Sequence, residues 1–282
     1  VAMPELHKLT DHDTIHFNHS KGPCPNVGFH LHDGCEVYFF ISGDANYLIE
    51  KNIYPMKYGD LFITNEHEVH APFFNSDCIY ERIYIQFDPK VARNLSTTTC
   101  DLLNCFYNRP AGHKNKIALD RIQLEEINFL FSKIENACNK NIWGNDIIKM
   151  SAFAELLVFI NRIFMDMKTD EDNGQMGQKL FPILDFIDCN LDQDLNLEIF
   201  EKTFYINKYY LCRIFKKATG MNLHEYIIFK RVARAKKLLM EGKSVTETCH
   251  LSGFNDYSNF IRTFKRTVGI SPGKYSKIAR GK

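Results

Sequence analysis

Residues 244–266 read SVTETCHLSGFNDYSNFIRTFKR, and their capping and turn residues predict two short helices joined by a tight turn. Ser244, with a glutamate three residues later, forms a capping box that marks the start of the first helix. Gly253 supplies the left-handed backbone that closes this helix. After the turn, Phe260 and Phe264 recur at helical spacing and give the second helix one apolar face. The stretch is typical of a helix-turn-helix unit.

A second unit of this kind lies upstream. Residues 195–203 predict a short helix, residues 204–206 a turn, and Asn207 then caps a helix that continues to Lys217. Between the two units, residues 223–240 carry a helical pattern throughout, and a helix of that length is about 27 Å long. Such a helix can set two recognition helices roughly 34 Å, one turn of DNA, apart. Two reading units in one polypeptide predict binding in successive major grooves of double-stranded DNA.

Polar and basic side chains remain on the outer face of the second helix of each unit. Arginine pairs bidentately with guanine, asparagine and serine read other base edges, and lysine mainly neutralises phosphate. The candidate DNA-binding residues are Lys208, Tyr209, Cys212, Arg213 and Lys216 in the first unit and Tyr257, Ser258, Asn259, Arg262 and Lys265 in the second.

Charge is divided unevenly along the chain, although its net charge is only +1. Residues 180–282 contain 18 Lys and Arg against 10 Asp and Glu, a net charge of +8, and residues 1–179 contain 17 against 24, a net charge of −7. A basic segment joined to an acidic one points to a polyanionic partner for one of them only. The alternative is a small helical domain whose basic residues are merely solvated, but charge, turn chemistry and spacing all favour DNA.

The rest of the chain has different patterns of apolar and aromatic residues. Short aromatic and alternating runs fill residues 14–90 between turn residues and predict an all-β barrel or sandwich. Apolar residues in 118–168 recur at helical spacing and predict two amphipathic helices. Residues 169–179 are polar without periodicity and predict a linker. The predicted fold is therefore α+β in two domains, a β-barrel with flanking helices in 1–168 and an all-helical domain in 180–282.

The C-terminal hundred residues closely resemble the signature of AraC/XylS-type transcription regulators. The matching residues are the run 231–239 and Val245, Cys249, Gly253, Phe254, Tyr257, Ser258, Phe260, Phe264, Lys265, Gly269, Ser271, Pro272 and Tyr275. Residues 211–220 resemble the family's first recognition helix and its exit. Asn207 stands where a serine cap is common, and Phe200-Glu201 replaces a small residue. The resemblance implies promoter binding near RNA polymerase, usually as an activator, and a homodimer formed through helices such as those in 118–168.

The sharpest feature upstream is a pair of histidines, His30 and His32, followed by Glu36. On a strand, residues two apart point to the same face. Together with a Gly59-Asp60 turn before two further histidines, the arrangement resembles a cupin barrel and the effector-binding domain of many AraC-type regulators. The candidate effector-binding residues are His30, His32, Glu36, Tyr38, His67 and His70.

Three interpretations of these residues compete. The first is a pocket for a small polar effector such as a sugar, with Tyr and Phe side chains stacking on it. The second is a metal site formed by His30, His32, Glu36 and His70, which would make the chain a metal-dependent sensor or a metal-binding cupin enzyme with an appended DNA-binding domain. The third is a set of structural histidines. The attached DNA-binding domain favours the first interpretation, with no enzymatic activity and no cofactor.

Composition also bears on location. Nine cysteines without a CxxC pair predict free thiols in a reducing cytoplasm. No stretch approaches the eighteen or more uncharged apolar residues of a membrane helix, and the first residues do not resemble a secretion signal. We therefore expect a cytoplasmic protein without membrane contact, whose partners are double-stranded DNA, RNA polymerase, a small effector and a second copy of itself.

Overall fold

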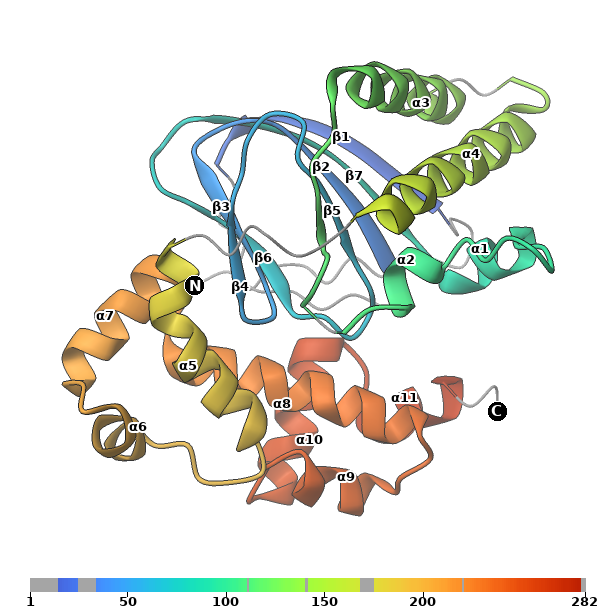
Figure 1. The fold of residues 1–282 in the computed structure, drawn as a ribbon. Coiled ribbons are helices and arrows are strands. Elements are labelled where there is room, and N and C mark those ends of the chain that lie inside the picture. The colour runs from blue at the N-terminus through green and yellow to red at the C-terminus, as the bar shows by residue number, and fades with distance from the viewer. Residues whose placement is uncertain are drawn as a thin grey trace.

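A computed structural model describes residues 15–24, 34–110, 112–139, 142–167, 175–219 and 221–279. We call residues 15–167 the N-terminal part and residues 175–279 the C-terminal part. Figure 1 shows strands and helices together in the upper half of the view and helices alone in the lower half. This arrangement confirms the predicted α+β class with an all-helical C-terminal part.

Two antiparallel sheets form the centre of the N-terminal part. Their strands are β1 (Ile15–Pro23), β2 (Cys35–Ser42), β3 (Ala45–Ile49), β4 (Asn52–Pro55), β5 (Leu61–Thr64), β6 (His70–Phe74), β7 (Ile79–Phe87) and β8 (Lys116–Ile117). The first sheet has the strand order β1-β7-β2-β5-β8 and the second has β4-β3-β6. The first seven strands confirm the β prediction for residues 14–90, whereas β8 has no counterpart in the sequence pattern. Assignment to the cupin type stays a prediction.

Strand β2 shows how the two faces of the first sheet differ. Val37 is buried in a cluster with the helices outside that sheet, and Tyr38 is buried in another cluster with residues of the second sheet. This alternation follows from the period of two along a strand. Tyr38 lies directly opposite Tyr84 of β7, and Glu36 lies opposite Gln86. The even-numbered residues of β2 and β7 thus line the inner face, between the sheets.

Four helices complete the described N-terminal part. They are α1 (Pro89–Leu95), α2 (Asn104–Tyr107), α3 (Arg121–Asn139) and α4 (Asn145–Asp166). The long helices α3 and α4 pack on the outer face of the first sheet (Figure 1), where Ile127 and Phe153 are fully buried. They confirm the two amphipathic helices predicted within residues 118–168 and the break between them.

The C-terminal part consists, over its described residues, of short helices around one long helix. They are α5 (Gln175–Cys189), α6 (Leu197–Phe204), α7 (Lys208–Thr219), α8 (Leu223–Met240), α9 (Val245–Leu251), α10 (Tyr257–Val268) and α11 (Pro272–Ala279). Helix α5 begins inside the segment 169–179 for which the sequence predicts a linker. Glutamine and lysine favour helices, so a polar composition alone does not prevent one from forming.

The predicted helix signals are present. Asn222 and Ser244 each form a complete capping box at the start of α8 and α9. Gly253 has a φ of 86° between α9 and α10, and Tyr205 takes the left-handed conformation, with a φ of 51°, between α6 and α7. These turns produce two helix-turn-helix units, α6–α7 and α9–α10, joined by α8.

The two units have separate cores. Phe260 and Phe264 of α10 pack with α9, α11 and one end of α8. Phe215 of α7 and Tyr226 of α8 pack with α5 and α6, and this cluster also contains Leu48 and other residues of the second sheet. The first unit therefore shares its core with the N-terminal part, whereas the second does not.

Two expectations based on composition can be compared with the structure. All nine cysteines are free thiols, as predicted. Among the described residues, none of the helices combines the length and the apolar character needed to span a membrane.

Candidate nucleic-acid interface and candidate ligand site

Helix α10 has one anchored face and one free face. Phe260 and Phe264 are fully buried against the rest of the second unit. The predicted DNA-reading residues lie on the other side, where Tyr257, Ser258, Arg262 and Lys265 are exposed and Asn259 is half-buried at the edge. A recognition helix needs this division, because its outer side chains must reach base edges while the inner face holds it in place.

Helix α7 is positioned in the same way. Asn207 Oδ1 accepts a hydrogen bond from the backbone N of Tyr209 at 3.0 Å and so caps the helix as predicted. Of the predicted residues, Tyr209, Arg213 and Lys216 are exposed, and Lys208 and Cys212 are half-buried. The Nζ of Lys208 lies 3.3 Å from Glu198 Oε1. Lys208 is therefore partly engaged within its own unit, and Arg213 and Lys216 are the freer cations.

An aromatic residue that the sequence analysis did not select supports Arg213. The guanidinium carbon of Arg213 lies 5.4 Å from the ring centre of Tyr210, which is 47% exposed. Stacking on an aromatic ring orients an arginine without using its hydrogen-bond donors. Because Tyr210 and Arg213 are three positions apart on one helix, their contact could have been predicted from the sequence.

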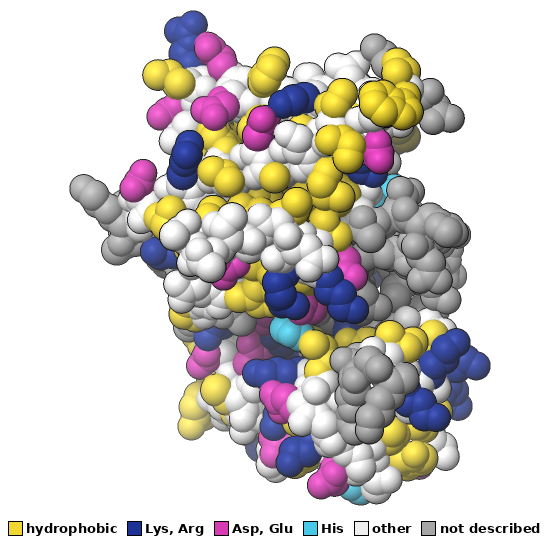
Figure 2. Space-filling view, turned by 90° about the vertical axis from the view of Figure 1, so that its right-hand side faces the viewer, with side chains coloured by type: hydrophobic (Ala, Val, Ile, Leu, Met, Phe, Trp, Pro, Cys, Tyr) yellow, Lys and Arg dark blue, Asp and Glu magenta, His cyan; other side chains and the backbone are white. Residues whose placement is uncertain are grey.

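Basic side chains are conspicuous on the face drawn in Figure 2. Lys and Arg gather over the lower part of that view, where the helical C-terminal part lies, and apolar side chains are frequent above. The surface therefore agrees with the uneven charge of the sequence.

The inner face of the first sheet carries a group of polar side chains. Glu36 Oε1 accepts a hydrogen bond from Tyr47 Oη at 3.1 Å, and Glu36 Oε2 accepts one from Gln86 Nε2 at 2.9 Å. The Nε2 of His70 lies 3.7 Å from Glu36 Oε1. The ring of Tyr38 stacks on that of Tyr47 with centres 4.7 Å apart. Burial raises the pKa of Tyr47, so this phenol keeps its proton and donates.

The structure brings together three of the six predicted effector-binding residues. Glu36, Tyr38 and His70 are buried between the sheets. His67 lies apart from them, on the loop between β5 and β6, with its Nε2 3.5 Å from Glu66. His30 and His32 fall outside the described residues. The sequence analysis missed Tyr47, Arg82, Tyr84 and Gln86, although the alternation of β7 would have placed the last three on one face.

The metal interpretation finds no further support. No three His, Cys, Asp or Glu side chains are grouped to hold a metal ion within the ranges that the structure describes. Because two of the four predicted ligands, His30 and His32, lie outside those ranges, the metal site stays a prediction.

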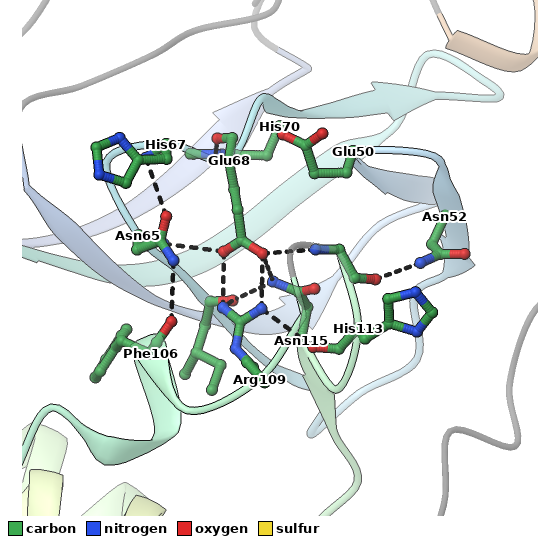
Figure 3. Close-up of polar contacts among 12 residues, drawn as sticks. Glu50, Asn52, Asn65, His67, Glu68, His70, Phe106, Arg109, His113 and Asn115 are labelled. Atoms are coloured by element: carbon green, nitrogen blue, oxygen red, sulfur yellow. Dashed lines mark hydrogen bonds and ion pairs between the residues drawn. The ribbon is translucent and has the colours of Figure 1, made fainter. Parts of the chain in front are cut away.

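Glu68, in the loop that leads into β6, is the centre of a buried polar network (Figure 3). Its side chain is 0% exposed and that of its partner Arg109 is 1% exposed. Arg109 Nη1 and Nη2 donate to the two carboxylate oxygens at 2.6 and 2.7 Å. The backbone N of Gly112 and the Nδ2 of Asn115 donate at 2.8 and 3.1 Å. These bonds hold the loop that presents Val69 to the neighbouring turn.

Glu50, in the turn between β3 and β4, connects the two parts of the chain. Its Oε1 accepts from the backbone N of Val69 at 2.7 Å, and its Oε2 forms an ion pair with Lys230 of α8. Tyr226 Oη donates to the Glu50 carbonyl at 2.9 Å, and Asp188 of α5 lies 3.0 Å from Lys230 Nζ. Burial acts to lower the pKa of Lys230, but Glu50, Tyr226 and Asp188 together outweigh it and raise that pKa above its usual value. Lys230 is therefore a buried, charged link between the parts.

Comparison with known proteins bears on the identity of the chain. A family model described as a helix-turn-helix domain matches residues 202–278. The chain is 24% identical over 276 residues to the HTH-type transcriptional activator RhaS of Yersinia pestis (strain Pestoides F), which covers 93% of this chain and 96% of that protein. It is 23% identical over 250 residues to the Msm operon regulatory protein of Streptococcus mutans, which covers 88% of this chain and 85% of that protein. The chain therefore contains a helix-turn-helix domain, and over most of its length it is similar to proteins named as transcription regulators.

A solved structure is similar to part of the chain. The DNA-binding domain of AdpA in complex with a target DNA is 25% identical, covers 36% of this chain and 93% of that chain, and has a TM-score of 0.35. The chain is a transcription regulator that binds double-stranded DNA through the helix-turn-helix domain of its C-terminal part. The relatives are regulators rather than enzymes, in agreement with the prediction that the chain is not an enzyme.

Proposed function

We propose that this chain is an AraC/XylS-type regulator, that it reads promoter DNA with α7 and α10, and that it is controlled by a small polar effector bound between the two sheets of its N-terminal part. One observation carries the proposal. A continuous run of polar contacts leads from Glu36, on the inner face of the first sheet, to Lys230 on α8, the helix that joins the two reading units.

The steps of this run are short. His70 Nε2 lies 3.7 Å from Glu36, and His70 Nδ1 donates to the backbone carbonyl of Glu68 at 2.8 Å. The next residue, Val69, exchanges backbone and side-chain hydrogen bonds with Glu50 at 2.8 and 2.7 Å. Glu50 then pairs with Lys230. A ligand that engages Glu36 or His70 shifts the start of β6 and so acts on Glu50 and α8.

The apolar contacts favour control of the first unit. Val69, in the loop before β6, and Leu48 of the second sheet share a core with Leu211 and Phe215 of α7. The second unit packs in a cluster without residues from the N-terminal part. A shift of the second sheet therefore changes the position of α7 relative to α10. Coupling of this kind requires the ligand to bind the two arrangements with different affinity.

Activation is the regulatory outcome that we propose, with RNA polymerase bound beside the regulator at the promoter. Its relative RhaS is named as a transcriptional activator, and the similarity extends over almost the whole of both chains. Transcription from the upstream promoter in vitro should rise when the regulator is added to polymerase. A fall would indicate a repressor.

We also propose a homodimer formed through α3 and α4. Large apolar side chains on these helices and their connection are exposed, including Ile122 at 75%, Phe129 at 66%, Trp143 at 98% and Ile147 at 68%. Exposed apolar side chains gathered in this way mark interaction surfaces. Light scattering at micromolar concentration, with and without DNA, should give the mass of a dimer, and Phe129→Glu should give a monomer. A monomer mass for the parent under both conditions would contradict the proposal.

DNA reading is tested with operator fragments from the region upstream of the regulated gene. Arg262→Ala should lose the preference for operator over scrambled DNA while residual nonspecific binding persists. Lys277→Ala, which removes one exposed positive charge from α11, is the matched control and should keep the preference. The assignment of Arg262 as a base reader is wrong if its alanine variant binds the operator as tightly as the parent does.

Coupling between the parts is tested with two adjacent residues of the same turn. Glu50→Gln removes the buried charge that faces Lys230, and loosening this contact should raise the affinity of the ligand-free protein for its operator roughly five-fold or more. Lys51→Gln removes an ion pair with Asp185 whose side chains are 21% and 46% exposed. Such a pair contributes little, so this control should stay within about two-fold. Equal affinities for both variants would exclude Glu50 from the coupling.

A further inference from the structure

The inner face of the first sheet carries a cation near one end. Arg82 of β7 forms no ion pair with any residue that the structure describes, and its Nε is buried without a hydrogen-bond partner. Its guanidinium carbon lies 5.7, 5.7 and 5.1 Å from the ring centres of Tyr38, Tyr80 and Tyr84. Aromatic faces stabilise a positive charge, but they supply no counter-charge. An arginine held in this way is suited to a planar anion that can accept two hydrogen bonds.

The other end of the same face is an acceptor. Glu36 is held by Tyr47 at 3.1 Å and by Gln86 at 2.9 Å. Gln86 stands four residues beyond Arg82 on β7, which is about 13 Å along a strand. A carboxylate at this end accepts hydrogen bonds from hydroxyl groups and repels an anion. The two ends therefore prefer opposite ends of a ligand.

Aromatic rings lie between the two ends. Tyr38 and Tyr84 are directly opposite each other in the register of β2 and β7. The hydroxyl of Tyr38 is buried without a hydrogen-bond partner among the described residues. Leaving such a buried group unpaired is unfavourable, and a ligand hydroxyl would supply the missing hydrogen bond. Flat rings beside unpaired donors are suited to a sugar ring.

We propose that the effector is a sugar that carries an acidic group, either a uronate or a sugar phosphate. Its anionic group binds Arg82, its ring packs against Tyr38 and Tyr84, and its hydroxyls face Glu36 and Gln86. This inference rests on the proposed function and adds the chemical class of the ligand. A neutral sugar would leave Arg82 without a counter-charge and would have no preferred direction between the two ends.

The test is calorimetric titration of the full chain with glucuronate, galacturonate and glucose 6-phosphate, and with glucose and galactose as their neutral counterparts. At least one acidic sugar should bind more tightly than its neutral counterpart, and the comparison of uronate with phosphate identifies the source of the charge. Arg82→Gln should weaken that binding about ten- to a hundred-fold, as expected for a hydrogen-bonded charge. Arg82→Lys keeps the charge but not the planar guanidinium group, so its affinity should lie between those of the parent and Arg82→Gln.

Two controls distinguish the loss of a ligand contact from a general loss of the folded structure. Arg93→Gln removes an exposed arginine from α1 and should leave the affinity unchanged. The circular dichroism spectrum of Arg82→Gln should match that of the parent. If neutral sugars bind as tightly as acidic ones, or Arg82→Gln leaves the affinity unchanged, the ligand class is wrong while effector control stands. If none of the five sugars binds and the operator is still recognised, the inference is overturned and effector control by a sugar falls with it.

Discussion

Arg109→Met should destabilise the N-terminal part more than any surface substitution. The side chains of Arg109 and Glu68 are 1% and 0% exposed, and two bonds of 2.6 and 2.7 Å join them. Removing one partner of a buried ion pair leaves the other charge without compensation, at a cost of about 3–5 kcal/mol. For a unit of roughly 150 residues, that corresponds to a fall in melting temperature of about 6–20 °C.

The assay is thermal unfolding of the full chain followed by circular dichroism, with the free energy of unfolding checked by urea titration. Arg162→Met, which removes an exposed arginine from α4, should change stability by about 0.5 kcal/mol or less. The double variant Arg109→Met/Glu68→Gln removes both charges and should lose less than the two single variants together. Strict additivity, or a loss below about 1 kcal/mol for Arg109→Met, would refute the reasoning.

Two further perturbations follow from local geometry. Gly253→Ala should lower the free energy of unfolding by more than about 1–2 kcal/mol, because the φ of Gly253 is 86° and a Cβ there would lie 1.8 Å from the Leu191 carbonyl oxygen. The control Gly273→Ala, at a position with open space around it, should leave the melting temperature unchanged or slightly higher. Equal melting temperatures for the two variants would contradict the strain at Gly253. Burial lowers the pKa of His67, so the unfolded chain binds more protons below the usual value near 6.5, and stability that is full above that pH falls as the pH drops. His67→Gln should reduce the loss in free energy of unfolding that urea titration measures between pH 7.5 and 5.5. An unchanged dependence of stability on pH would exclude His67 as its source. The charged groups around His67 are Glu66, Glu68, Lys236 and Lys237.

The helical part is largely predictable because its signals are local. A capping residue and its glutamate are three residues apart, and Phe260 and Phe264 are four apart, so the boundaries and the buried face of α9 and α10 follow from neighbouring positions. The outward position of Arg262 follows from the same periodicity. The strands within residues 14–90 were predictable for the same reason, since alternation and turn residues are also short-range features.

The connection between the two parts was not predictable in this way. Glu50 and Lys230 are 180 positions apart in the sequence, and neither belongs to a local motif that would single it out. The ligand face depends on the register that sets Glu36 opposite Gln86, which no single strand reveals. The alternation of β7 was visible, but which of its two faces lies inward depends on the packing of α3 and α4 against the other.

The N-terminal part packs against the first unit but leaves most of the predicted DNA-reading side chains of α7 and α10 exposed. This limits how an effector could control DNA binding. Tyr209 is 76% exposed, and Arg213 and Arg262 are exposed as well, although Lys230 and the core of the first unit are buried against the N-terminal part. The effector that we propose therefore has no reading face to uncover. It can act only on the relative position of the two units, because one of them shares a core with the second sheet and the other does not. Two recognition helices must enter successive grooves about 34 Å apart, so a small rotation of α7 about α8 is enough to change affinity.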